Sequence, residues 1–143
     1  MKDLIQINSI NKVPNFTDGN AKINNGESDL TGFERIAIPI LNGHEVIKVK
    51  NIIRCEANGN YTTIYCIEDK KFIISRHLKE LEIALSSGGF LRLHHSHIIN
   101  PIYIQRILKS DGGTVVLTDG KKIRISKNKQ NILHLLFDEI LKL

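Results

Sequence analysis

From residue 35 onward, short runs of β-branched and aromatic residues alternate with turn residues, which is the pattern of an antiparallel β protein. Asn42-Gly43 separates the first two runs, and this dipeptide favours the positive φ angles of a type I′ hairpin turn. Asn58-Gly59-Asn60 separates the next two runs and predicts a second hairpin. The expected strands are 36–40, 46–49, 52–57, 61–67, 71–74 and 90–93, followed by a meander of 102–108, 114–117 and 121–125.

Two stretches have a helical period instead. Leu78, Leu81 and Leu85 recur at i, i+3 and i+7, with Ser75 as a candidate N-cap and Gly88-Gly89 as the stop. A second apolar series follows Ser126, which can cap it, and consists of Ile132, Leu135, Leu136, Ile140 and Leu143. The chain is therefore expected to be mostly β, with one short internal helix and one C-terminal helix.

The beginning of the chain lacks these patterns. Residues 1–35 contain six Asn and no sustained period of 2 or 3.6, which is typical of a tail or linker. Leu4-Ile5-Gln6-Ile7 is the one short apolar string that could dock on the domain as an added strand. We therefore expect a poorly ordered tail over 1–34 and a single domain over 35–143.

Composition excludes several classes of protein. No apolar run approaches the roughly 18 residues that cross a bilayer, and the first residues lack the apolar block of an export signal, so a cytoplasmic location without membrane contact is expected. Cys55 and Cys66 lack CxxC spacing and are expected to be buried, reduced thiols. No phosphate-loop, nucleophile-elbow or HExxH motif is present, so we expect no catalytic residue and no cofactor.

Positive charge is concentrated in the domain. Of the net charge of +5, residues 1–35 hold 4 basic and 5 acidic side chains, which leaves 16 basic and 10 acidic residues, or +6, for the remainder. The densest basic stretch, Lys121 to Lys129, has no acid, and on a strand Lys122 and Arg124 would point outward together. Lys127, Asn128 and Lys129 follow at the strand-to-helix junction. This arrangement suits phosphate binding, although a solvated edge strand protected by lysines has the same composition.

His94-His95-Ser96-His97 is the second cluster with possible chemistry. On an extended segment His95 and His97 share a face, so a metal site would need one or two further ligands. The carboxylates of Glu82 and Asp111 are distant along the chain, and we expect no metal here. The imidazoles could instead bind a base edge or a phosphate, or satisfy a buried carbonyl.

The order of these motifs resembles the LytTR family of bacterial DNA-binding domains over about residues 34–140. The most specific likeness is the string Phe90-Leu91-Arg92-Leu93-His94-His95-Ser96-His97-Ile98-Ile99-Asn100, which has the spacing F-x-R-x-H-x-S-x-x-x-N. The segments Ile53 to Tyr61, His77 to Leu81 and Ile125 to Asn128 are also similar to the family's pattern. The resemblance implies an elongated β fold of successive antiparallel hairpins and a meander, which reads successive major grooves of double-stranded DNA through loops.

The resemblance also implies which residues act. It gives three contact regions: Asn60, Tyr61 and Thr62 in one loop, His95 in a second, and Lys127, Asn128 and Lys129 after the last strand. Strand alternation adds Lys122 and Arg124 to the expected DNA contacts. Arg92, His94, Ser96 and Asn100 match the family string and are expected to support the loop. The family often has Arg where Lys127 and Asn128 stand, so readout of guanine there is weakened, because Lys is a point charge and Asn prefers adenine.

The sequence thus predicts a non-enzymatic bacterial transcription regulator, a response-regulator output domain, with possible pairs of copies on repeated half-sites. Two alternatives stay open at this point. One is a β-rich protein-interaction or sensory module whose basic surface meets an acidic partner. The other is a histidine-based metal binder.

Overall fold

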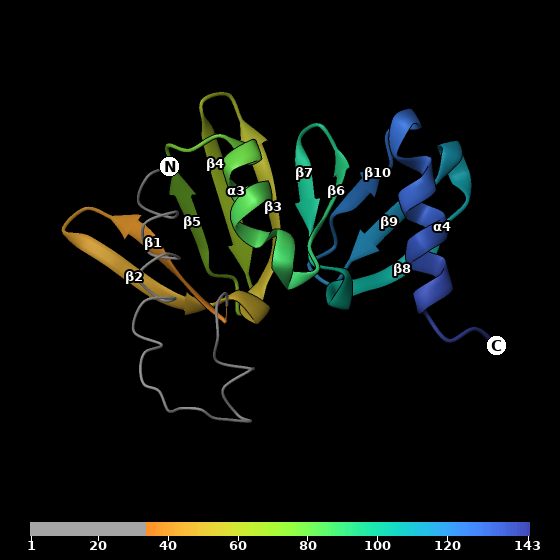
Figure 1. The fold of residues 1–143 in the computed structure, drawn as a ribbon, viewed down its shortest axis with the longest axis horizontal. Helices are drawn as coiled ribbons and strands as arrows, with labels where there is room; N and C mark the ends of the chain where they lie inside the picture. Colours follow the sequence, from red (N-terminus) through yellow and green to blue (C-terminus); the bar gives the residue numbers. More distant parts are fainter. Residues whose placement is uncertain (1–33) are drawn as a thin grey trace.

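The computed structural model describes residues 34–143, and it contains ten β-strands and two α-helices within that range. The expected tail, including Leu4-Ile5-Gln6-Ile7, lies outside the described residues except for Glu34. Figure 1 shows the strands in antiparallel sheets placed one after another along the long axis. The prediction of an elongated, mostly β fold is confirmed.

Three sheets make up the fold. The first pairs β1 (Arg35–Ile40) with β2 (Gly43–Lys48). The second has the order β5 (Lys71–Ile74), β4 (Tyr61–Cys66), β3 (Ile52–Asn58), β7 (His97–Ile99) and β6 (Leu91–His94). The third is the expected meander of β8 (Ile104–Leu108), β9 (Thr114–Leu117) and β10 (Lys122–Arg124). α3 (Leu78–Leu85) covers one face of the five-stranded sheet, and α4 (Gln130–Glu139) follows β10 (Figure 1).

Two apolar cores hold these sheets together. The first lies under α3 and includes Ile38, Ile52 and Leu81, all fully buried. The second joins the five-stranded sheet to the meander and includes Leu93 and Val115. Each such side chain stabilises the fold by about 1.5–3 kcal/mol. Both cysteines are free and buried in the first core, as predicted.

The type I′ turn predicted at Asn42-Gly43 is wrong. Ile40 pairs with Gly43, so Leu41 and Asn42 form the turn, and only Gly43 in that hairpin has a positive φ. Among the non-glycine residues of the described range, positive φ angles occur at Glu68 (62°) and Asp69 (59°), which join β4 to β5. Strand register, rather than the dipeptide alone, decided which residues turn.

Both predicted helix caps are also wrong. α3 begins after His77 without a side-chain cap, so Ser75 plays no part. Ser126 precedes a 3₁₀ turn, η7 (Lys127–Lys129), in which the Lys129 N–H donates to the Ser126 carbonyl, and α4 begins only afterwards. α4 ends at Glu139, and of the predicted apolar series Leu136 is buried while Leu135, Ile140 and Leu143 are exposed.

Candidate nucleic-acid interface

Three connections lie along one edge of the molecule in Figure 1: the β3–β4 turn, the β6–β7 turn and the segment from β10 into α4. We call this the turn edge. Strand pairing explains it, because β3 pairs with both β4 and β7 and therefore brings their turns to the same end of the sheet. The Ala57 N–H donates to the Ser96 carbonyl at 2.9 Å, and the Ser126 N–H donates to the Leu93 carbonyl at 3.0 Å. Backbone bonds thus tie the neighbouring connections to one another.

The β3–β4 turn presents two of its three predicted contact residues. Gly59 adopts a φ of 63°, and Asn60 and Tyr61 are exposed, with 53% of Tyr61 accessible. Thr62 is fully buried, and its hydroxyl donates to the Arg76 carbonyl at 2.7 Å. Pairing of β4 with β5 places the Thr62 side chain inside, at the Arg76 carbonyl, which argues against the predicted DNA contact.

The β6–β7 turn places His95 at an exposed tip. β6 ends at His94 and β7 begins at His97, so the extended segment on which His95 and His97 would share a face does not exist. The rings of His94 and His95 lie 4.4 Å apart, and His94 Nδ1 accepts a hydrogen bond from the Ser96 N–H at 3.1 Å. Because Nδ1 is the acceptor, Nε2 carries the proton of neutral His94.

Arg92 holds this turn through its guanidinium group. Nε donates to the His94 carbonyl at 3.2 Å, and NH2 donates to the His95 carbonyl at 2.5 Å. NH1 donates to the Glu82 carboxylate at 2.8 Å. These are contacts that a loop-supporting residue makes. The Asn100 amide instead donates to the Ile52 carbonyl at the far end of β7, so its contacts tie β7 to β3 rather than reaching the loop.

The basic stretch forms the third part of the turn edge. Lys122 and Arg124 are exposed on either side of buried Ile123, as strand alternation predicts. Lys127 and Asn128 are exposed, whereas Lys129 is half-buried.

A hollow of about 700 Å³ lies against this stretch, and we call it the cationic hollow. Its lining residues are His94, Gly112, Arg124, Ile125, Ser126, Lys127 and Gln130. Among the lining side chains that the structure describes, those of Arg124 and Lys127 are cationic and none is acidic. The hollow therefore favours an anion.

The surroundings of His94 and His97 lower the pKa of both side chains and so favour their neutral form. Burial, followed by the charges of His95, Arg124 and Arg92, lowers the pKa of His94. Burial also lowers the pKa of His97 to about 4, against the opposing effect of Glu56. Within the described residues, His97 Nδ1 is buried without a hydrogen-bond partner.

Arg54 is an important residue that sequence reasoning missed. Only 6% of it is exposed, and it lies between the carboxylates of Glu56 and Asp119 with its guanidinium over the ring of Tyr65. The sequence held one weak sign of this role: on the predicted strand, Arg54 and Glu56 are two residues apart and so share a face, where they could form an ion pair. Asp119 is 65 residues away, and nothing local in the sequence indicates that pair.

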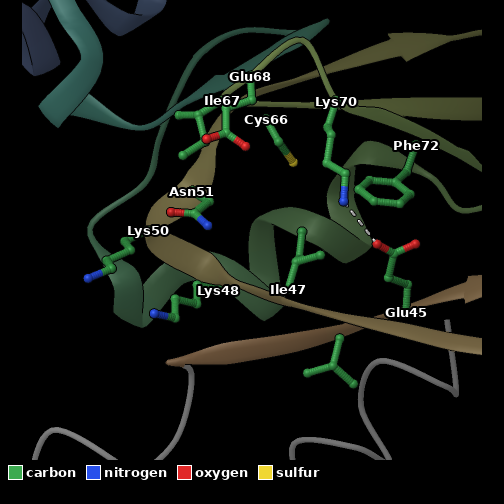
Figure 2. Close-up of a pocket in the computed structure, with 11 residues that line it drawn as sticks. Glu45, Ile47, Lys48, Lys50, Asn51, Cys66, Ile67, Glu68, Lys70 and Phe72 are labelled. Carbon is green, nitrogen blue, oxygen red and sulfur yellow. Dashed lines mark hydrogen bonds and ion pairs between the residues drawn. The ribbon is translucent and has the colours of Figure 1, made fainter.

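A second hollow, of about 310 Å³, lies between β2 and the β4–β5 turn (Figure 2). The Lys70 ammonium pairs there with the Glu45 carboxylate at 3.3 Å, beside the ring of Phe72 (Figure 2). Its lining includes Lys48, Lys50 and Lys70 together with Glu45 and Glu68, so we call it the mixed hollow. No predicted site residue lines it.

Residues 34–143 contain neither a candidate metal site nor a candidate membrane-spanning helix. In this range, no group of three or more His, Cys, Asp or Glu side chains is placed to hold a metal ion. Neither described helix has the length and apolar character needed to cross a membrane.

Comparison with known proteins identifies the family. The LytTr DNA-binding domain family matches residues 42–138. Two relatives from Paraburkholderia xenovorans (strain LB400), the heme-containing CO-sensing transcriptional regulators RcoM 2 and RcoM 1, are each 30% identical over 101 residues. Each match covers 68% of this chain and 38% of the relative, so the chain spans well under half the length of these regulators.

A solved structure has the same fold. It is the LytTr DNA-binding domain of a putative methyl-accepting/DNA response regulator from Bacillus cereus, with a TM-score of 0.63 and 19% identity. The match covers 74% of this chain and 98% of that domain.

Proposed function

Because the chain belongs to the LytTr DNA-binding domain family, we propose that it binds double-stranded DNA sequence-specifically, as the output domain of a bacterial transcription regulator. The observation that carries this proposal is the turn edge, where exposed polar residues of three connections lie beside a hollow lined by the cationic side chains of Arg124 and Lys127. The names of the two relatives, both transcriptional regulators, support it.

Affinity in this proposal comes mainly from phosphates. Lys122, Arg124 and Lys127 release counterions when they meet the DNA backbone, which gives binding that weakens steeply with salt. The cationic hollow lies next to the β6–β7 turn, so a phosphate held there would fix the position of that turn on the duplex.

Sequence preference comes from the turns. We propose that His95 and the pair Asn60 and Tyr61 enter successive major grooves, which are wide enough, at about 12 Å, to admit a hairpin. At the third region, the family often has arginine, whose guanidinium is a forked donor, whereas this chain has the point charge of Lys127 and the amide of Asn128. An amide pairs with adenine in two hydrogen bonds, so we expect adenine rather than guanine to be preferred there.

Selection from a pool of random duplexes tests the proposal. The bound fraction is enriched over several rounds and sequenced, and competition gel shifts then compare the best selected duplex with a scrambled duplex of the same composition. We expect the selected duplex to bind at least about a thousandfold more tightly. Equal binding of both duplexes would favour the rival function, an interaction module whose basic surface meets an acidic partner.

We also propose that two copies bind repeated half-sites. Analytical ultracentrifugation on duplexes carrying one or two copies of the selected sequence tests this point. Two chains on the double site, with tighter binding than on the single site, are expected.

A further inference from the structure

Arg54 lies at the centre of a polar cluster between the five-stranded sheet and the meander. Its Nε donates to Asp119 Oδ2 at 2.8 Å, and its NH1 donates to Glu56 Oε1 at 2.7 Å. The guanidinium carbon lies 3.6 Å from the centre of the Tyr65 ring. The Lys121 backbone N–H donates to Asp119 Oδ1 at 3.1 Å, and the Lys121 ammonium forms an ion pair with Glu56 Oε2 at 3.9 Å. We call these five residues the Arg54 cluster.

This cluster makes a directional contact between the two sheets. The apolar core they share, with Leu93 and Ile99 facing Val115 and Ile123, is held by burial, which has no preferred direction. A planar guanidinium that bonds two carboxylates accepts a narrow range of geometries. The apolar core therefore supplies adhesion. The Arg54 cluster, beside the bond from the Ser126 N–H to the Leu93 carbonyl, constrains the angle between the sheets.

The cluster also lies at the base of two parts of the turn edge. On one side, β3 runs from Arg54 through Glu56 to the β3–β4 turn. On the other side, Asp119 lies in the turn that leads into β10, and β10 continues to Arg124 and then Lys127. A change in the angle between the sheets would move these two parts of the turn edge relative to each other.

We propose that Arg54 is a positioning residue that sets the distance between the β3–β4 turn and the β10–η7 segment on DNA, and so the spacing of the bases that the protein recognises. This inference rests on the proposed function. Its physical basis is that a buried ion pair adds little net stability, because its desolvation offsets its attraction, but it can specify one arrangement over others.

The experiment uses the best duplex selected by the wild-type chain and derivatives with one base pair inserted or deleted between its two recognised base clusters. For the wild-type chain, each change of spacing should weaken binding about tenfold or more. For Arg54→Met, the same changes should weaken binding about threefold or less, because the sheets can adjust their angle. Asp119→Asn, which keeps an acceptor for the Lys121 N–H, should give an intermediate penalty.

Lys70→Met is the matched control, because it removes the cation of an exposed ion pair in the mixed hollow. It should retain the wild-type spacing penalty. Thermal melting shows at which temperature each variant is folded, and binding is measured at that temperature. If Arg54→Met does not fold, the spacing penalty of Asp119→Asn decides the test.

The spacing penalty separates positioning from simple stabilisation. An unchanged penalty in folded Arg54→Met or Asp119→Asn would overturn the inference, even if both variants bind all duplexes more weakly. A wild-type penalty below about threefold would overturn it as well. Neither result would touch the proposed function, which fails only if the wild-type chain prefers no sequence.

Discussion

The cationic hollow and the mixed hollow contain similar basic side chains but differ in their acids. Among the described lining residues, the first has Arg124 and Lys127 and no carboxylate, whereas the three lysines of the second stand among Glu45 and Glu68. One of these lysines, Lys70, is already paired at 3.3 Å. The density of lysine is therefore a poor guide to an anion site. What distinguishes the cationic hollow is that no carboxylate stands among the lining side chains that the structure describes, beside turns that carry exposed polar residues.

Charge reversal should show this difference most strongly. Arg124→Glu/Lys127→Glu should weaken binding to every duplex by roughly a thousandfold near 0.1 M salt, because two phosphate contacts become repulsive. Lys48→Glu/Lys50→Glu changes the net charge equally in the mixed hollow and should cost less than about tenfold. Filter binding of selected and scrambled duplexes measures both effects. Equal losses in the two double variants would show that only net charge matters.

Truncation of one histidine tests the turn edge more locally. His95→Ala should reduce the ratio of affinities for the selected and scrambled duplexes by about 5- to 150-fold, which corresponds to a lost base contact of roughly 1–3 kcal/mol. His44, also exposed but on β2 near the mixed hollow, is the matched control, and His44→Ala should leave the ratio unchanged. Competition gel shifts at one salt concentration measure the ratio. A loss shared by both variants would argue against base contact by His95.

The strands were predictable from the sequence because their signals are local. Alternation placed Ile123 inside and Arg124 outside, and Gly59 supplied the turn of the second hairpin. The family string drew attention to Arg92 and His94, which both make hydrogen bonds within the β6–β7 turn. Where the buried face and the turn residues of a short element are close in sequence, the element can be predicted without knowledge of the rest of the fold.

The remaining features depend on contacts between distant parts of the chain. Thr62 follows two exposed residues, yet strand pairing buries it against the Arg76 carbonyl. Arg54 and Asp119 meet only because the meander packs on the five-stranded sheet. Residue pattern alone gave no turn at His95-Ser96, which is not a common turn dipeptide, and the family resemblance placed the loop that the bonds from Arg92 hold.

A charge-conserving change separates the geometry of the turn edge from its charge. Arg92→Lys keeps the cation but loses the fork that bonds the His94 and His95 carbonyls. Sequence discrimination should fall about 2- to 10-fold, while the salt dependence of binding stays the same. Lys79→Arg on the exposed face of α3 is the reverse exchange and should change neither quantity. A reduced salt slope in Arg92→Lys would mean that Arg92 contacts phosphate directly.

The last effect concerns the stability of the strands behind the turn edge rather than DNA binding. His97 has a pKa of about 4 in the folded protein, below the 6.5 of an unperturbed histidine, so the unfolded chain binds its proton first as the pH falls. The stability due to neutral His97 is therefore complete above about pH 6.5 and is lost progressively between pH 6.5 and 4, by on the order of 1–2 kcal/mol for this half-buried group. In His97→Gln this part of the pH dependence should be absent, while the titration of carboxylates is common to both proteins.

Hydrogen exchange, corrected for intrinsic rates, should show the loss of protection in β6 and β7 before the β4–β5 hairpin of the mixed hollow. Equal pH dependence in wild type and His97→Gln would assign the acid sensitivity to the carboxylates instead.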